Sequence, residues 1–392
     1  MRKYRVLFIS SHFPNRTQPE RATYNRQQIS HLAKLCEVKV VAPYAYFPLL
    51  KYGNKGARLQ DIPHREIIEG VEVFHPPYFY TPKFFPSLYG IFYFLSILNP
   101  VKRIYRRFPF EVIYTNWLYP DSFAAMLIAR YFRKNFVSCA LGSDVNLYMK
   151  YPLRKRMILT TIKNSYKALC VSEDLKRKLI KQGISSEHIE VLYDGVDSQL
   201  FTPQDRSLAR KKLGINPKGK IILYVGNLEP WKGPEYLLEA FSLIPQRNNL
   251  SLFFVGDGPE RKKLEKFVRE RKISRVHFAG KKSHTIIPLW MNACDVLCIP
   301  SLTEGVPNVM LEAWACGKPV IASRVGGIPE LMHEEVGIMV PPGNPRAIAD
   351  ALEKGLSKRW DEGKIREYAL KFSWEENALR LFQILKTACQ EP

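Results

Sequence analysis

The stretch that decides the fold is IPSLTEGVPNVMLEAWACGKPVIAS, residues 299–323. An apolar strand ends at Pro300, a polar loop follows, and an apolar helix continues to Gly317, a residue type that commonly ends helices. A second apolar run at 318–323 predicts another strand. Two short strands joined by a helix indicate parallel pairing with a right-handed crossover.

Two acids flank the turn in this stretch. Glu304 lies on the loop, and Glu312 lies about one turn inside the helix. The turn between them exposes successive amides at a helix N-terminus, which suits a diphosphate. Glu312 is too deep for phosphates but could accept hydrogen bonds from ribose hydroxyls. Alternatively Glu304 is a solvated loop acid and Glu312 a helix-surface acid, although the otherwise apolar helix argues against this.

The same alternation of strands and helices extends outward over the whole chain. With 392 residues, the chain is too long for one ordinary core. We predict an α/β protein with two doubly wound, Rossmann-like domains facing across a cleft, joined by a linker near 198–219. The expected strands are 5–10, 37–43, 71–75, 111–116, 136–141, 167–172 and 189–195, then 220–226, 250–256, 275–280, 295–300, 318–323 and 337–342.

Two further loops follow strands of the second series. In YVGNLEPWKG, residues 224–233, Lys232 precedes a helix, where an ammonium group suits a phosphate. The loop GDGP at 256–259 lets backbone approach a ligand closely. Each loop alone also fits an ordinary turn, with Lys232 as a solvated lysine. Because the loops follow strands of one sheet, together they predict one pocket.

The bulk composition limits the possible partners and location. The net charge of +22 attracts polyanions, whether nucleic acid, anionic lipid or phosphorylated substrate. The seven cysteines are scattered without a CxxC pair, which favours reduced, buried thiols. The apolar run at the start is too short for a signal sequence, and no run reaches the ~20 residues of a membrane span. We therefore expect a cytoplasmic protein, with contact to the inner membrane face as an option.

Residues 78–110, YFYTPKFFPSLYGIFYFLSILNPVKRIYRRFPF, interleave aromatic and basic side chains. One interpretation is a buried helix of the first domain. The other, which we favour, is an interfacial segment that places aromatic rings at lipid headgroups and basic side chains on anionic lipid. The basic residues concerned are Lys102, Arg103, Arg106 and Arg107.

Motifs along nearly the whole chain resemble the family 4 retaining glycosyltransferases (glycosyl transferase group 1), which have the GT-B fold. The resemblance is most specific over 190–345 and looser before residue 120. It rests on the signature at 301–323 and on VGGIPEL (325–331), GNLEPWKG (226–233), VGDGP (255–259) and VLYDGVDSQLFTP (191–203), which occur in the family's order.

The resemblance implies roles for domains and residues. Residues 1–198 would bind the acceptor, 199–372 the nucleotide sugar, and 373–392 would form a helix crossing back to the first domain. Glu304 and Lys232 would be the catalytic residues, contacting the donor sugar and neutralising the pyrophosphate. The donor-binding positions would be Asn227, Lys281, Gly305, Asn308, Val309 and Glu312.

The chain departs from the family pattern at several places. Asn227 stands where the family usually has arginine, and Leu141 where a histidine usually precedes the glycine of GSD. The loop after the first strand has no glycine, and the family's NGVD reads DGVD from Asp194. We expect an arginine of the first domain to supply the missing charge, the candidates being Arg16, Arg21 and Arg26.

Two residues of the first domain are acceptor-side candidates. His12 ends the first strand and could contact a ligand, although a surface or core histidine is the commoner case. Asp144 in GSD could orient an acceptor hydroxyl, or could equally be the N-cap of a helix near 145–160.

The expected reaction is transfer of a sugar from a UDP- or GDP-sugar to a hydroxyl of a glycan or lipid-linked acceptor, with retention of configuration. It needs neither a metal nor another cofactor if amides and Lys232 stabilise the leaving diphosphate. The alternatives are epimerisation or hydrolysis of a nucleotide sugar by the same fold, a degenerate transferase that only binds ligands, and a non-catalytic polyanion-binding protein. Nucleic acid is not an expected partner because no known binding module is apparent.

Overall fold

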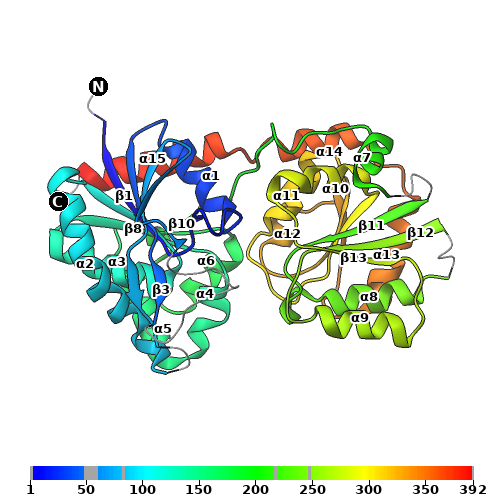
Figure 1. Ribbon diagram of the computed structural model, residues 1–392, viewed down its shortest axis with the longest axis horizontal. Coiled ribbons are helices and arrows are strands. Elements are labelled where there is room, and N and C mark those ends of the chain that lie inside the picture. The colour runs from blue at the N-terminus through cyan, green and yellow to red at the C-terminus, as the bar shows by residue number, and fades with distance from the viewer. Residues whose placement is uncertain (1–2, 48–60, 82–83, 216–218, 246–248, 391–392) are drawn as a thin grey trace. The chain divides into compact units, whose positions relative to one another are not determined.

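The computed structural model describes residues 3–47, 61–81, 84–215, 219–245 and 249–390. Positions 82–83 of the aromatic and basic stretch and 216–218 of the expected linker lie outside these residues. The chain is α/β and divides into two compact units (Figure 1). Unit 1 comprises Met1–Tyr193 and Trp374–Pro392, and unit 2 comprises Asp194–Ser373.

The main sheet of unit 1 is parallel except at one edge, where β4 pairs antiparallel with β5. Its order is β10 (Ile189–Val191), β9 (Lys167–Cys170), β8 (Asn135–Ala140), β7 (Val112–Asn116), β1 (Arg5–Ile9), β2 (Glu37–Val41), β5 (Val71–Phe74) and β4 (Arg65–Ile68). The short strands β3 (Tyr44–Tyr46) and β6 (Pro77–Phe79) form a separate parallel pair.

Helices cover both faces of this sheet, so its central strands are apolar on both sides. On β1, Val6 and Phe8 join a core that includes Leu381 of the C-terminal helix, whereas Leu7 and Ile9 join a second core on the opposite face. The helices are α1 (Thr23–Leu32), α2 (Tyr89–Arg107), α3 (Phe123–Phe132), α4 (Ser143–Asn146), α5 (Pro152–Asn164), α6 (Glu173–Ile180) and α15 (Trp374–Gln390).

The C-terminal helix α15 packs on unit 1 although it follows all of unit 2 in the chain (Figure 1). Leu379 of α15 is 42% exposed, because the buried stripe follows another side of the helix. The apolar residues of that stripe recur every three or four positions, as helical packing requires. They are Trp374, Ala378, Leu381, Leu385 and Ala388.

Unit 2 contains a six-stranded sheet whose neighbouring strands all pair in parallel. Its order is β13 (Val276–Gly280), β12 (Leu250–Val255), β11 (Lys220–Val225), β14 (Val296–Ile299), β15 (Val320–Ser323) and β16 (Gly337–Val340). Its helices are α7 (Arg206–Leu213), α8 (Pro234–Leu243), α9 (Arg261–Glu270), α10 (Ile287–Ala293), α11 (Asn308–Ala315), α12 (Ile328–Leu331), α13 (Pro345–Ser357) and α14 (Glu362–Ala369).

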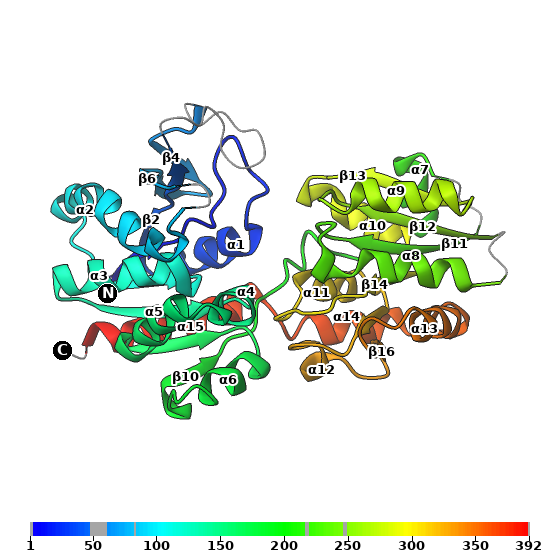
Figure 2. The ribbon, with the colours of Figure 1, turned by 90° about the horizontal axis from the view of Figure 1, so that it is seen from below.

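The unit 2 sheet lies between two helical layers. Helices α8, α9 and α13 pack on one face, and α7, α10, α11 and α14 lie on the other (Figures 1 and 2). Both units thus have the doubly wound architecture expected from the sequence. In such sheets ligands bind at the carboxyl ends of the strands.

Candidate active site

Glycines bring the loops of unit 2 into close contact at the carboxyl ends of its strands. Gly233 and Gly326 have left-handed φ angles of 63° and 55°, which favour glycine. A Cβ on Gly233 would overlap the carbonyl oxygen of Pro300, and one on Gly326 would overlap that of Glu304. The loops after β11 and β15 therefore both rest on the loop after β14.

Backbone hydrogen bonds hold these loops together. The amide of Leu302 donates to the carbonyl of Trp231 at 2.8 Å, and the amide of Gly327 donates to that of Gly305 at 2.7 Å. The loops after β11, β14 and β15 are thus joined into one surface. Their side chains are positioned by backbone contacts.

The centre of this surface is an ion pair between the two predicted catalytic residues. Lys232 lies in the short 3₁₀ helix Pro230–Lys232, and its Nζ donates to both carboxylate oxygens of Glu304, at 2.6 and 2.7 Å. Ser301 Oγ also donates to Glu304, at 2.7 Å. Glu304 is only 9% exposed, so its charge depends on these donors. This geometry is consistent with the sequence prediction that Lys232 and Glu304 serve one site. The sequence did not indicate the contribution of Ser301.

The N-terminus of α11 lies directly after this ion pair in the chain. Pro307 occupies the N-cap position and provides no side-chain hydrogen bond. The first amides of a helix have no intrahelical partner, so those of Asn308 and Val309 can bind an anion. The predicted phosphate seat at Gly305–Val309 thus has free donor capacity and a favourable helix dipole.

Glu312 is not a solvated surface acid. Its Oε1 lies 2.9 Å from His284 Nε2, and both side chains are largely buried. His284 belongs to the 3₁₀ helix His284–Ile286, which follows β13, and its ring meets Phe201 edge-on at 5.1 Å. Sequence reasoning missed this histidine, although its place shortly after the predicted base-contacting position Lys281 could have indicated it.

The two remaining predicted donor residues, Asn227 and Lys281, are exposed at the ends of β11 and β13. The carbonyl of Asn227 accepts a hydrogen bond from Tyr224 Oη at 2.8 Å. Burial, followed by the nearby Glu304 carboxylate, raises the pKa of the Tyr224 phenol. Tyr224 therefore anchors the Asn227 loop within the electrostatic influence of Glu304, a role that the sequence did not indicate.

In unit 1, His12 lies in the loop just after β1, against an aromatic ring. It stacks on Trp117 with ring centroids 4.5 Å apart, and Asn25 Nδ2 donates to its backbone carbonyl. Burial, then the charge of Arg21, lowers the pKa of His12 to about 3. The ring is therefore neutral at physiological pH and cannot supply the cation missing from the family pattern.

Asp144 is fully buried, and its carboxylate accepts backbone hydrogen bonds. The donors are the amides of Leu141, Gly142, Val145 and, from the loop after β7, Leu118. The N-cap of α4 is Gly142, so the expectation that Asp144 is an N-cap is wrong. Burial raises the pKa of Asp144, and the amide donors oppose this shift. These contacts indicate a structural role; orientation of an acceptor hydroxyl stays a prediction.

The three candidate arginines differ in their surroundings. Arg16 is exposed, whereas Arg26 Nε lies 3.2 Å from Glu69 Oε1. Arg21 lies close enough to His12 to lower its pKa. Arg26 therefore already has an anionic partner, and the supply of the missing charge by one of these arginines stays a prediction.

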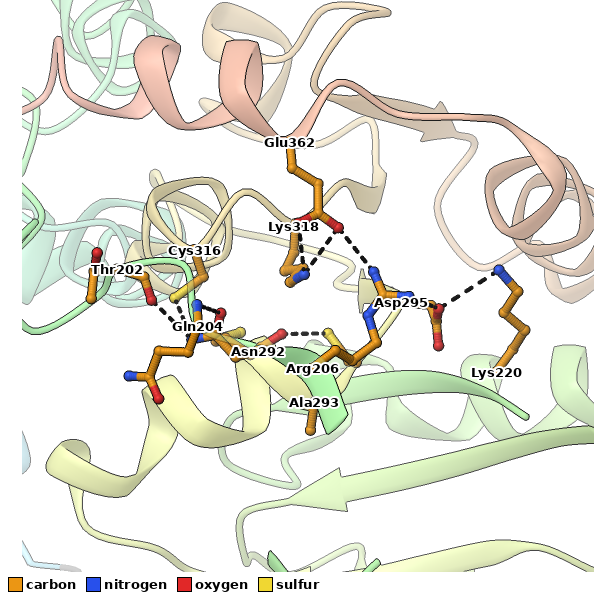
Figure 3. Close-up of polar contacts among 12 residues, drawn as sticks. Thr202, Gln204, Arg206, Lys220, Asn292, Ala293, Asp295, Cys316, Lys318 and Glu362 are labelled. Carbon is orange, nitrogen blue, oxygen red and sulfur yellow. Dashed lines mark hydrogen bonds and ion pairs between the residues drawn. The ribbon is translucent and has the colours of Figure 1, made fainter. Parts of the chain in front are cut away.

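A second polar cluster lies at the opposite, amino-terminal edge of the unit 2 sheet (Figure 3). Buried Asp295, just before β14, accepts hydrogen bonds from Arg206 and Arg210 of α7 at 2.6 and 2.8 Å. Lys318, just before β15, pairs with Glu362 of α14. Because these groups link helices to strand beginnings, the cluster is structural and separate from the loops described above.

The chain also matches known protein families over most of its length. Residues 22–200 match the model of "Glycosyltransferase Family 4", and residues 205–372 match that of "Glycosyl transferases group 1". Together with the two Rossmann-like units and the site in unit 2, these matches define a glycosyltransferase. The chain belongs to the family 4 glycosyltransferases, which have the GT-B fold.

Individual relatives agree with this assignment. N-acetyl-alpha-D-glucosaminyl L-malate synthase from Bacillus anthracis is 27% identical over 66% of this chain and 68% of its own length. The structure of sucrose-phosphate synthase from Thermosynechococcus elongatus matches with a TM-score of 0.82 and 22% identity, over 98% of this chain and 99% of that one. Anabaena HepE in complex with UDP-glucose matches with a TM-score of 0.67 and 18% identity, over 99% of each chain.

Proposed function

We propose that this protein transfers a sugar from a UDP- or GDP-sugar to a hydroxyl of a glycan or lipid-linked acceptor, with retention of configuration. The observation that carries the proposal is the Lys232–Glu304 ion pair, followed in the chain by the N-terminus of α11, which no side chain caps among the described residues. The structural similarity to a protein in complex with UDP-glucose supports a nucleotide-sugar donor.

In the proposed reaction the bond between the sugar's anomeric carbon and the diphosphate breaks. The acceptor hydroxyl oxygen forms the new bond on the same face, and its proton leaves with the diphosphate. Negative charge builds on the diphosphate, where the amides of Asn308 and Val309, the α11 dipole and Lys232 stabilise it. Because these groups neutralise the leaving group, we propose a reaction that needs no metal.

The other residues would position the donor. Glu304 accepts hydrogen bonds from sugar hydroxyls, and Glu312, oriented by His284, accepts them from the ribose. The amide of Gly305 contacts phosphate oxygens. Exposed Asn227 contacts the diphosphate, and backbone groups at Lys281 contact the base.

The decisive experiment incubates the purified protein with a panel of UDP- and GDP-sugars, with and without glycan and lipid-linked acceptors. Transfer that requires the acceptor, persists in EDTA and retains anomeric configuration by NMR would support the proposal. An epimerised donor or free sugar formed without acceptor would support the alternative reactions. Failure of every nucleoside diphosphate to bind would contradict the proposal.

We also propose that unit 1 contacts an anionic membrane surface, where a lipid-linked acceptor would lie. Among the helices in the described ranges, none is both long and apolar enough to span a bilayer. One face of α2 is core, with Tyr93 and Ile97 buried, but Leu95 is 61% exposed on the other. Just before α2, Phe84 and Phe85 are 69% and 67% exposed, an arrangement that suits the headgroup region.

Basic side chains on the last turns of α2 complement these apolar groups. Arg103, Arg106 and Arg107 are exposed, whereas Lys102 lies 4.5 Å from the ring of Tyr131. Each exposed base near an anionic surface contributes about 1 kcal/mol of attraction. The contact should therefore weaken with salt.

Vesicle co-sedimentation tests the membrane proposal. Wild-type protein should bind vesicles containing phosphatidylglycerol at low salt, and the double variant Phe84→Ser/Phe85→Ser should bind several-fold less. Leu208→Ser, at an exposed leucine of α7 in unit 2, is the matched control and should bind like wild type. Equal binding by all three proteins would exclude the Phe84–Phe85 surface, and no binding at low salt would exclude membrane contact.

A further inference from the structure

An acidic side chain outside the predicted donor residues contacts the proposed phosphate seat. Asp194 is the first residue of unit 2. Its carboxyl accepts a hydrogen bond from the side chain of Asn308, the first residue of α11. The segment after it is fixed, because Val196 pairs with Ser373 and its amide donates to the carbonyl of Phe372 at 2.9 Å.

No ion pair compensates this carboxyl in the part of the chain that the structure describes. Burial raises the pKa of Asp194 to about 7, with the Asn308 hydrogen bond acting in the opposite direction. Charged groups of the adjoining segments have other partners: Asp197 accepts from backbone amides, and Glu312 pairs with His284. Lys371, two residues before the isolated bridge at Ser373, lies over the ring of Tyr368.

With a donor bound, the N-terminus of α11 would face two acidic groups, the carboxyl of Asp194 and the diphosphate. A helix N-terminus carries a partial positive charge that favours a carboxylate or a phosphate nearby. Asp194 contacts the helix N-terminus through its hydrogen bond with the Asn308 side chain. The donor diphosphate would contact it through the backbone amides of Asn308 and Val309. When both are charged they repel each other at short range, where the partly buried setting screens poorly.

We propose that Asp194 is a determinant of donor affinity: as a neutral carboxylic acid it leaves the first turn of α11 to the diphosphate, and as a carboxylate it competes with it. The inference rests on the proposed function, because it uses the diphosphate seat. Diphosphate affinity falls as pH rises and Asp194 ionises. Conversely, binding near neutral pH favours the protonated form, so the protein takes up a proton.

Calorimetric titration of UDP, GDP and ADP tests this inference at about pH 6 and about pH 8.5, in buffers of different ionisation enthalpy. Asp194→Asn keeps the shape and stays neutral. Asp197→Asn removes the same charge three residues further on, where the side chain contacts only backbone amides of its own segment among the contacts described. For each protein the measured quantity is the fold loss of diphosphate affinity from the lower to the higher pH. This loss should be at least about fivefold larger for wild type and Asp197→Asn than for Asp194→Asn.

Proton linkage gives a second, independent readout. Near neutral pH, wild type and Asp197→Asn should take up more protons on binding than Asp194→Asn does; ionisation of the ligand phosphate cancels in this comparison. Asp194→Asn should also retain its thermal midpoint at high pH, since it removes a poorly solvated charge.

The possible outcomes distinguish failure of the Asp194 inference from failure of the proposed function. If wild type and Asp194→Asn bind a diphosphate with the same pH dependence and the same proton uptake, the inference is overturned while the diphosphate site stands. If no protein binds any of the three diphosphates at either pH, the proposed function fails and the inference fails with it.

Discussion

Replacing Glu304 by glutamine should change diphosphate binding and turnover in opposite directions. The Glu304 carboxylate accepts hydrogen bonds from Lys232 Nζ at 2.6 and 2.7 Å. When a diphosphate binds at the α11 N-terminus, the Glu304 charge repels it while Lys232 attracts it. Glu304→Gln removes the repulsion and frees Lys232, but it also removes the predicted acceptor for the donor sugar's hydroxyls.

The magnitude follows from the surroundings of the pair. Two unit charges about 6 Å apart repel by roughly 3 kcal/mol at an effective dielectric constant of about 20. The Lys232 side chain is 31% exposed, so solvent lowers the expected effect to about 1 kcal/mol, or about fivefold in Kd. Turnover should fall by about 100-fold, because the lost contact acts on the reacting sugar.

Calorimetry with a nucleoside diphosphate and steady-state kinetics with the matching sugar donor measure the two effects. Lys232→Met should weaken diphosphate binding and lower turnover together, since it removes the attraction. Glu353→Gln, at an exposed acid of α13, is the charge-matched control and should change neither. Weaker diphosphate binding by Glu304→Gln, or unchanged turnover, would refute the proposed placement of the diphosphate and sugar.

Three further expectations follow from other contacts. Gly326→Ala should lower the thermal midpoint and donor affinity together, because its Cβ would overlap the loop after β14; a wild-type midpoint would contradict this packing. Arg210→Met leaves buried Asp295 short of a donor and should cost about 3–5 kcal/mol in calorimetric unfolding, whereas Lys212→Met on the exposed side of the same helix should cost little. His12, whose pKa of about 3 lies below the unfolded value near 6.5, should make the protein lose stability as pH falls from about 6.5 toward 3; His12→Asn should flatten this part of the profile.

The sequence predicted the fold well because its main signals are local. Each strand expected from an apolar run is present, although strand ends shift by up to a few residues. The strands it missed, β3, β4 and β6, have only three or four residues and stand outside the longer apolar runs from which the other strands were predicted. The exposed Leu379 of α15 shows that apolar character alone does not determine which side of a helix packs.

The sequence could predict those site residues whose position follows from the strand that precedes them. Lys232, Glu304 and the turn before Val309 follow strand ends, so their shared edge follows from topology. The partners of these residues were not predictable in the same way. His284 meets Glu312 only because separate loops converge, a relation no local pattern contains.

The Asp144 result shows a similar limit. An aspartate after a strand and before a helix reads as an N-cap. In the structure, however, the Asp144 carboxylate also accepts a hydrogen bond from the amide of Leu118, which follows β7. The residue before it, Trp117, has a positive φ of 75°. A positive φ angle is unusual for tryptophan, so this backbone conformation could not be inferred from the amino-acid sequence.

The position of α15 has a consequence for biosynthesis. Leu381, Leu385 and Ala388 complete a core whose other buried residues come from the first half of the chain. During translation, all of unit 2 emerges before this helix is available, whereas unit 1 lacks part of its interior until residues 374–390 have been made. The second lobe can therefore mature first, and nascent chains halted before α15 should leave the earlier lobe with an open apolar groove and a need for chaperones.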